Sequence, residues 1–495
     1  MNSTAPAPKE AWTATPLAQA RMLLLYALTV LVALPVMLGV GPARFSLLAR
    51  LVAWLGMAIA GLPTLWLLTA RRARPSTVAA LGLWITMCYF MAVLHEERLL
   101  LRWGMARLSE DSVVLAMLFA ALVVPLLSAG WWLGGAVGLA RLLPQPRLEV
   151  ADRPLWMAGA GIVSVSLLAD ILWLRNELST DRPIMSLIAA LTPADLGFAM
   201  VLVPALRPGA GRARWVFWAL FAASASVALM RGTLGPLVMP LLIYLLGWLY
   251  LRRRLRLWPV VAALLVVVLF QPVKGEFRAK VWDREVRLTL VERLQLFVEL
   301  SARHWVGSDT GPVVDHEQSV KQAAARTSSA LQLAHAIEMT PAVVPHQGGA
   351  TYRYFRYTFL PRVLFPDKPI AQYADVWAAV MYGYTTPEGT AHVMIGLPQM
   401  AEAYINFGLL GGLLLFLGMG LLLRAADEIF AHGAAGAGAL ALYLFFVEQE
   451  MLSLEGSLAQ FWGGVLQRFL VYTLAMALLG ALTRRPLQTR PQIAV

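Results

Sequence analysis

Long apolar stretches, separated by short polar connections, dominate the pattern of this chain. Met22–Val40, Ser46–Thr69 and Trp258–Phe270 contain no charged side chain except Arg50. Most such stretches approach the roughly 20 apolar residues that cross a bilayer as a helix. A helix satisfies its backbone hydrogen-bonding groups within a single segment, as lipid requires. The pattern therefore predicts transmembrane helices.

The same pattern predicts about twelve spans. They lie near residues 22–40, 46–69, 77–94, 112–139, 154–174, 184–206, 213–230, 232–251, 258–272, 396–423, 437–452 and 463–482. Composition agrees, because 59% of the residues are hydrophobic and only 14% are charged. A soluble domain carries about a quarter charged residues, so this chain has too little polar surface to be one.

Loops rich in arginine alternate along the chain with loops poor in arginine, and this alternation orients the spans. The loops after the second, fourth, sixth and eighth spans and the C-terminal tail are rich in arginine, whereas the other loops hold fewer basic residues or balance them with acidic ones. The positive-inside rule then places both termini in the cytoplasm. The net charge of +12 reflects these loops, so we expect no nucleic-acid partner.

The predicted organisation has five parts. They are a disordered cytoplasmic N-terminus (1–20), nine spans (21–272), a large outer loop (273–395), three further spans (396–482) and a cytoplasmic tail (483–495). Cys88 is the only cysteine, which excludes a disulfide within the chain.

The outer loop holds most of the interpretable chemistry. Apolar residues recur at helical spacing in Arg287–Trp305, which predicts an amphipathic helix on the membrane surface. A second helical pattern follows at Arg326–Ile337. Gly348–Pro369 then interleaves basic and aromatic residues: Arg353, Arg356, Arg362 and Lys368 among Tyr352, Tyr354, Phe355, Tyr357, Phe359 and Phe365.

This interleaving has two interpretations. Guanidinium groups bind phosphate through paired hydrogen bonds, and aromatic rings stack on sugars, so the segment suits an anionic, sugar-bearing ligand. Alternatively, the aromatic residues form an interfacial belt and the arginines meet lipid headgroups.

Several ionisable residues share the outer half of the predicted membrane, which suggests a polar cavity beneath the large loop. They are Asp170, Arg231, Glu402, Glu448, Glu450 and Arg468. A snorkelling side chain or a structural ion pair would also explain each one alone. Asp195 falls at mid-membrane, where a helix–helix hydrogen bond explains it adequately.

Four segments resemble a known family. PRVLFPDKP (Pro361–Pro369) and EAYINFGLLGG (Glu402–Gly412) resemble the O-antigen polymerases of bacterial envelopes, the Wzy-type oligosaccharide repeat-unit polymerases. Ala325–Pro341 is similar to the outer loop of that family. Leu229–Gly235 resembles the Ser-Arg-Gly turn of related polymerases and O-antigen ligases, although Met230 stands where Ser is usual.

The resemblance implies an all-α membrane fold of the GT-C glycosyltransferase type in the bacterial inner membrane, with the large loop in the periplasm. It implies an exopolysaccharide or O-antigen polymerase that uses undecaprenyl-diphosphate-linked oligosaccharide, with no cofactor and no metal. Membrane lipids, and other polysaccharide-assembly proteins, are the further partners it suggests. The sequence is compatible, because it has no glycine-rich nucleotide loop and no Asp-x-Asp motif.

Candidate roles follow from this chemistry. Arginines would neutralise the diphosphate leaving group: Arg231 and Arg278 first, then Arg326, Arg353, Arg356 and Arg362. The general base would be His392 or Glu402, and the sugar-binding residues would be Tyr352, Tyr357, Tyr404 and Lys368. Simpler roles stay open: membrane anchoring for Arg278, a solvated loop residue for His392, and a favourable helix start for Glu402.

Two other functions stay open at this point. A ligase would transfer finished glycan to another acceptor with the same chemistry. A transporter or flippase of the lipid-linked oligosaccharide would not be an enzyme, and such proteins usually have inverted repeats and sites at mid-membrane. This chain shows no evident repeat and places its charges near one face, which favours the enzyme.

Overall fold

The computed structural model describes most of the chain. The described residues are 16–39, 45–70, 75–91, 108–146, 148–174, 192–252, 254–256, 258–281, 288–306, 329–358, 360, 365, 367–391, 395–431 and 436–483. They form α-helices and short 3-10 helices, and this part of the chain contains no strand. Six of its helices are long and apolar enough to cross a membrane. The protein is therefore an all-α, multi-pass membrane protein.

Each predicted span overlaps a helix, although the full set of spans and their orientation stay predictions. The N-terminal helices are α1 (Pro16–Gly39), α2 (Leu47–Thr69), α3 (Thr77–Tyr89), α4 (Glu110–Val137) and α5 (Asp152–Leu174). The central helices are α7 (Ala194–Ala205), α8 (Gly211–Arg231), α9 (Gly235–Arg252) and α10 (Trp258–Val281). The C-terminal helices are α16 (Gln399–Phe430), α17 (Ala437–Ser453) and α18 (Leu458–Thr483).

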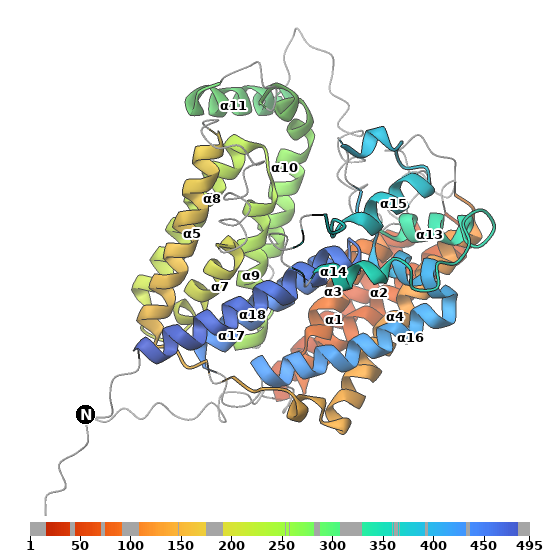
Figure 1. Ribbon diagram of the computed structural model, residues 1–495, viewed down its shortest axis with the longest axis horizontal. Coiled ribbons are helices and arrows are strands. Elements are labelled where there is room, and N and C mark those ends of the chain that lie inside the picture. The colour runs from red at the N-terminus through yellow and green to blue at the C-terminus, as the bar shows by residue number, and fades with distance from the viewer. Residues whose placement is uncertain are drawn as a thin grey trace, which may run out of the picture.

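The helices form two groups that α17 joins (Figure 1). One group contains α5, α7, α8, α9 and α10, and the other contains α1, α2, α3, α4 and α16. Helix α17 packs against α7 and α9 of the first group and against α3 and α16 of the second. Because it contacts both sides along its length, its side chains are buried almost throughout.

Helices α4 and α16 form an extensive contact at small residues. A Cβ atom added at Gly130 would lie 2.0 Å from the carbonyl oxygen of Leu417, and one at Gly420 would lie 2.3 Å from that of Leu127. Small residues allow membrane helices to approach this closely. Alanine at either position would force the two helices apart.

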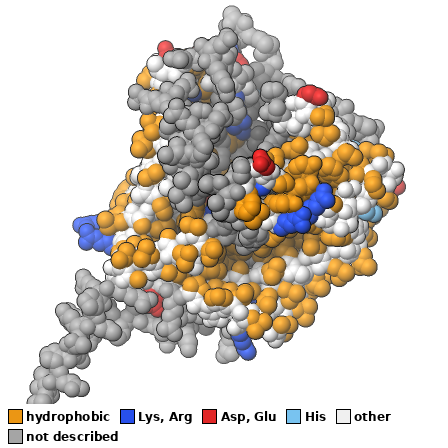
Figure 2. Space-filling model, in the orientation of Figure 1, with side chains coloured by type: hydrophobic (Ala, Val, Ile, Leu, Met, Phe, Trp, Pro, Cys, Tyr) orange, Lys and Arg blue, Asp and Glu red, His pale blue; other side chains and the backbone are white. Residues whose placement is uncertain are grey.

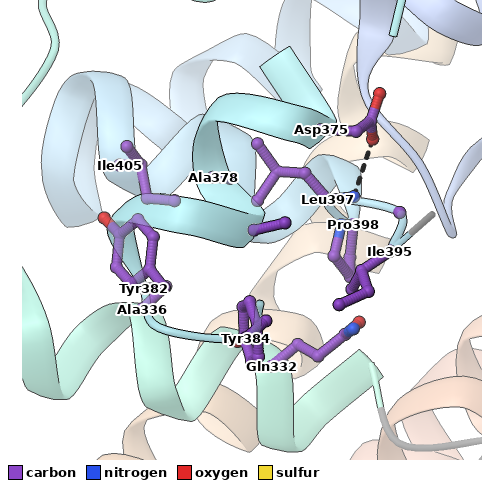
Figure 3. Close-up of a pocket in the computed structure, with 12 residues that line it drawn as sticks. Gln332, Ala336, Asp375, Ala378, Tyr382, Tyr384, Ile395, Leu397, Pro398 and Ile405 are labelled. Carbon is purple, nitrogen blue, oxygen red and sulfur yellow. Dashed lines mark hydrogen bonds between the residues drawn. The ribbon is translucent and has the colours of Figure 1, made fainter. Parts of the chain in front are cut away.

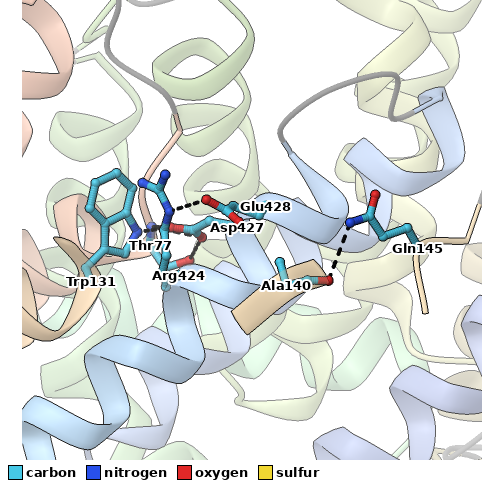
Figure 4. Close-up of polar contacts among 7 residues, drawn as sticks. All are labelled: Thr77, Trp131, Ala140, Gln145, Arg424, Asp427 and Glu428. Atoms are coloured by element: carbon cyan, nitrogen blue, oxygen red, sulfur yellow. Dashed lines mark hydrogen bonds and ion pairs between the residues drawn. The ribbon is translucent and has the colours of Figure 1, made fainter. Parts of the chain in front are cut away.

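A fully buried aspartate ties the ends of several helices together (Figure 4). Asp427 accepts hydrogen bonds from the backbone N–H of Thr77, at 3.0 Å, and from its hydroxyl group. The indole N–H of Trp131 donates to it at 2.6 Å and the hydroxyl of Tyr443 at 3.0 Å. The carboxylate thereby satisfies the first turn of α3, where anions are stabilised, and links α3, α4, α16 and α17.

Large apolar side chains remain exposed over the helix surfaces, as lipid contact requires. Examples are Leu31 on α1, Leu410 on α16 and Leu474 on α18, which are 60%, 71% and 63% exposed. Figure 2 shows hydrophobic side chains spread over much of the visible face, with Lys and Arg gathered in a few places.

The outer loop contains the two predicted helices. The first is α11 (Leu290–Val306), and the second is α13 (Ser329–Met339). Helix α11 lies across the ends of α8 and α10 at the top of Figure 1. It buries Phe297 against Phe277 of α10, with ring centroids 5.5 Å apart. Leu294 and Val298 are exposed beside this buried contact. The charged pair Glu299 and Arg303 is also exposed, so the helix has the amphipathic character that the sequence predicts.

The rest of the described loop is short helices and turns. They are η5 (Tyr352–Tyr354), α14 (Phe355–Thr358), α15 (Tyr373–Met381) and η6 (Glu388–Ala391). Outside this loop, a 3-10 turn, η3 (Leu139–Leu142), follows α4. Helix α14 lies beside α18, and α13 lies beside α4 and α16, with α15 above α13 in Figure 1.

The orientation is tested by reporter fusions. Because nine predicted spans separate a cytoplasmic start from the large loop, an alkaline phosphatase fusion near Gly348 should be active and one near Arg253 should be inactive. The measurement is phosphatase activity normalised to fusion protein in the membrane. The reverse pattern would invert the topology and move the polymerase site proposed below to the cytoplasm.

Candidate functional site

The outer loop is fastened to the start of α16 at a break in that helix. Gly408 has φ of 66° and ψ of −162° inside α16, which interrupts the helical hydrogen bonding. The carbonyl oxygens of Ile405 and Asn406 accept instead from the backbone N–H groups of Gln347 and Gly348, both at 3.0 Å. The carbonyl groups that the break releases are therefore satisfied by the loop, which fixes the loop to the helical bundle.

Glu402, a candidate base, lies at the centre of this attachment. Its side chain is fully buried, and one carboxylate oxygen accepts from the Thr351 hydroxyl at 2.7 Å. The other accepts from the backbone N–H of Leu458 at 2.7 Å, in the first turn of α18. Both oxygens thus bind the protein itself, and the arrangement gives Glu402 a positioning role between the loop, α16 and α18.

A second buried carboxylate, Asp375 of α15, makes a parallel attachment (Figure 3). It accepts from the backbone N–H of Leu397 at 2.7 Å and from that of Ser457 at 3.1 Å. The Ser457 hydroxyl donates to its other oxygen at 2.5 Å. Asp375 also lines a cavity of about 10 Å³ between α13, α15 and the residues before α16, which is room for about one water molecule.

The burial of Asp375 predicts that the stability of the protein to unfolding depends on pH. Burial raises the pKa of its carboxyl above the ordinary value, and its hydrogen bonds oppose this only in part. Its contribution to folding is therefore fully present below the unfolded aspartate pKa of about 3.9 and is lost as pH rises through the raised folded-state pKa. An Asp375→Asn variant stays neutral and can donate to the Ser457 hydroxyl. Thermal unfolding followed by tryptophan fluorescence should show wild type losing stability relative to this variant as pH rises, and the opposite trend would refute the assignment.

The two leading diphosphate candidates are brought together at the C-terminal ends of α8 and α10. Arg231 forms an ion pair with Asp170 of α5, and both side chains are 29% exposed. Arg278 donates from Nε to the carbonyl oxygen of Gly232, the residue after Arg231, at 2.8 Å. Lys274 lies one turn before Arg278 on α10 and is buried. The two arginines therefore belong to one basic site that keeps partial access to solvent.

Gly232 explains why this approach is possible. Its φ is +70°, in the left-handed region that favours glycine. A Cβ atom there would lie 2.9 Å from the Phe277 ring and 3.2 Å from Cγ of Arg278. The turn after α8 can thus press its backbone against α10, which sets the position of Arg278 beside Arg231.

The sugar-binding candidates separate into two environments. Tyr357 and Lys368 line a cavity of about 360 Å³ in the outer loop, and Lys368 Nζ donates to the Tyr357 carbonyl oxygen at 3.1 Å. Tyr352 instead stacks on Phe407 with ring centroids 5.7 Å apart. Tyr404 is buried, and its hydroxyl donates to the Thr340 carbonyl oxygen at 3.3 Å. Of these four residues, Tyr357 and Lys368 are the two that line one of the described cavities.

Arg353 and Arg356 are exposed and contact tyrosines of their own segment. The guanidinium carbon of Arg356 lies 4.8 Å from the centre of the Tyr357 ring, and that of Arg353 lies 5.3 Å from the Tyr354 ring. Figure 1 places this segment beside α18, whereas Arg231 and Arg278 lie on α8 and α10 of the other helical group. The predicted basic residues are thus distributed over two places.

Three candidates lie outside the described residues: His392, Arg326 and Arg362.

No protein-family model, curated protein or solved structure matches this chain. Within the described ranges, no group of three or more His, Cys, Asp or Glu side chains is close enough together to hold a metal ion.

The remaining intramembrane ionisable residues of the prediction lie on α7, α17 and α18. Glu448 and Glu450 are buried on α17, and each keeps one carboxylate oxygen without a hydrogen-bond partner. Arg468 is exposed on α18, and Asp195 begins α7. Asp195 interacts electrostatically with Glu448, because α7 packs against α17. These four residues are not among those that line the described cavities.

Sequence reasoning passed over Asp375 and Asp427, which join distant segments. Asp375 and Ser457 are 82 positions apart, and Thr77 and Asp427 are 350 apart. One signal could have pointed to both pairs: an acidic residue inside an apolar pattern together with a Ser or Thr just before a predicted helix, since such a helix start takes a carboxylate well.

Proposed function

We propose that this protein is a polysaccharide polymerase that transfers glycan from an undecaprenyl-diphosphate-linked donor to a lipid-linked repeat unit at the outer face of the membrane. The observation that carries the proposal is the meeting of Arg231 and Arg278 through Gly232. The resemblance of four segments to O-antigen polymerases supplies the substrate class.

The proposed reaction needs a site for a diphosphate leaving group. The acceptor hydroxyl oxygen forms a bond to the anomeric carbon of the donor, and the bond from that carbon to the diphosphate oxygen breaks. The bonding electrons leave with the diphosphate, and the acceptor proton passes to a base. Two guanidinium groups at the outer ends of α8 and α10 suit the charge that develops on the leaving group, because each can offer paired donors to phosphate oxygens.

The position of this site fits a lipid-linked donor. A diphosphate stays at headgroup depth while its polyprenyl chain lies in the bilayer. Arg231 is the last residue of α8 and Arg278 lies in the last turn of α10, so both lie at the predicted membrane boundary. Cations are also favoured at helix C-termini for structural reasons, and the mutational test below separates these two roles.

The cavity beside Tyr357 and Lys368 supports sugar binding in the loop. At one cavity, the Tyr357 ring provides a stacking face and the Lys368 ammonium group provides a positive charge. We assign Tyr357 and Lys368 to the glycan. Tyr352 and Tyr404 are assigned to holding the loop on α16, because their contacts are made within the protein.

His392 is our first choice for the base, because both oxygens of Glu402 bind the protein. A histidine base requires the neutral imidazole, so activity should fall as pH drops through about 6.5, the unperturbed histidine pKa. His392→Ala should lower the polymerisation rate by about 100-fold or more, within the usual range for general-base removal. If His392→Ala keeps the wild-type rate and pH profile in purified protein, histidine is not the base.

One observation bears on the transporter alternative, namely the break in α16 at Gly408. Broken helices commonly line substrate sites in transporters. Here the released carbonyl groups bind the outer loop, and Asn406 also accepts from the backbone N–H of Gly349 at 3.0 Å. The break therefore anchors the loop, and it does not favour transport over transfer.

The proposal is tested with purified protein in liposomes and extracted undecaprenyl-diphosphate-linked repeat units. A polymerase should produce a ladder on a gel with steps of one repeat. A ligase would add glycan in a single step to a different acceptor. A transporter would move the lipid-linked unit across the bilayer without changing its size, and either of these outcomes would overturn the proposal.

A further inference from the structure

A second basic site lies at the other end of the bundle, where α7, α8 and α9 meet. A cavity of about 280 Å³ is lined there by ten residues, of which three are arginines and none is acidic. The arginines are Arg214, Arg252 and Arg256. This end carries the arginine-rich loops that the topology places in the cytoplasm, so the cavity is distinct from the proposed polymerase site.

The walls of the cavity combine charge with aromatic and apolar surface. Trp218, Tyr244 and Trp248 line it together with leucine and alanine side chains from the end of α7. The guanidinium carbon of Arg256 lies 3.9 Å from the centre of the Trp248 ring, which fixes that cation over an aromatic face. Arg252 donates to the carbonyl oxygen of Leu206 at the end of α7, so its position is also set by the fold.

One donor in this wall lacks a partner. The indole N–H of Trp248 is buried and makes no hydrogen bond within the protein. An acceptor atom that a bound ligand brings beside the Trp248 ring would supply the missing partner. Aromatic belts and basic loops are common at membrane boundaries, but they do not by themselves form a concave site with an unpaired donor.

We propose that this cavity binds the phosphate of an anionic phospholipid headgroup from the cytoplasmic leaflet. Basic cavities between helices on this side are suited to such headgroups, and the leaflet supplies them at high local concentration. The arginines contact the phosphate oxygens, Trp248 donates to one of them, and the apolar wall accepts the start of the acyl chains. This inference does not depend on the polymerase proposal.

The test is native mass spectrometry of delipidated protein titrated with phosphatidylglycerol, phosphatidylcholine or inorganic phosphate. The wild-type binding constant for phosphatidylglycerol should exceed that for phosphatidylcholine by at least about tenfold. A double variant, Arg214→Gln with Arg256→Gln, should lose this preference. Arg153→Gln with Arg141→Gln removes the same charge from exposed positions on the predicted cytoplasmic side and should keep it.

A second variant guards against misfolding of the double variant. Trp248→Phe keeps the ring and removes the N–H, and it should weaken phosphatidylglycerol binding several-fold. Equal phosphatidylglycerol binding by wild type, the double variant and Trp248→Phe would overturn the proposal. Displacement of the lipid by millimolar inorganic phosphate would also overturn it, because the site would then serve a soluble anion.

Discussion

Replacing Arg231 by alanine is expected to abolish polymer formation while the protein still inserts and accumulates in the membrane. The side chain ends α8 beside Arg278 and remains 29% exposed, so it can reach a ligand. Loss of one donor to a developing oxyanion typically lowers a rate by about 10²–10³-fold. The measurement is the initial rate of ladder formation by purified protein, normalised to folded protein from size-exclusion chromatography.

Two further variants separate leaving-group binding from folding. Arg231→Lys should recover little activity, because an ammonium group cannot offer the paired donors of a guanidinium. Asp170→Asn removes the ion-pair partner of Arg231 and keeps the guanidinium group. This variant should retain most activity, because the role of Asp170 is to position Arg231. Arg303→Ala removes an exposed arginine paired with Glu299 on α11 and serves as the matched control. Wild-type rates from Arg231→Ala would remove this residue from the site.

Glu402→Ala is expected to produce the largest loss of stability. The variant leaves the Thr351 hydroxyl and the Leu458 backbone N–H buried without their acceptor. Each such group costs about 1–3 kcal/mol, so the expected loss is about 2–6 kcal/mol. The loop and the first turn of α18 should loosen together, which hydrogen–deuterium exchange would detect at both segments.

Matched variants make the Glu402 prediction specific. Glu388→Ala removes an exposed glutamate of the outer loop and should leave the unfolding temperature unchanged. Glu402→Gln keeps one acceptor oxygen and should fall between wild type and alanine in stability. If Glu402→Ala unfolds at the wild-type temperature but loses activity, Glu402 acts in catalysis and the positioning role is wrong.

The helices were largely predictable because hydrophobic length and helical spacing are local properties. The stretch 258–272 predicted a span, and α10 indeed begins at Trp258. The helix continues to Val281 because Phe277 and Val281 pack against α11, a contact that no local pattern reveals. Spacing in Arg287–Trp305 likewise predicted α11, whereas which of its apolar residues face the bundle depends on α10.

The candidate site was predictable only in part. The placement of Arg231 and Arg278 near one membrane boundary could be predicted from the topology. Each follows the predicted outer end of a span, and the two spans are close in sequence. The attachment of Glu402 to Thr351 and Leu458 was not predictable, because it joins three segments more than 50 positions apart. Tyr352 and Tyr357 look alike in the sequence, yet Tyr352 stacks on Phe407 and Tyr357 lines a cavity.

The central claim is glycosyl transfer from a lipid diphosphate, and its most direct test is a product balance. Purified protein in liposomes is supplied with undecaprenyl-diphosphate-linked repeat units, and released undecaprenyl diphosphate is counted against new glycosidic bonds. The account predicts one undecaprenyl diphosphate for each repeat added, and almost none from Arg231→Ala protein. Repeat units that cross the bilayer unchanged, with no undecaprenyl diphosphate released by the wild-type protein, would contradict it.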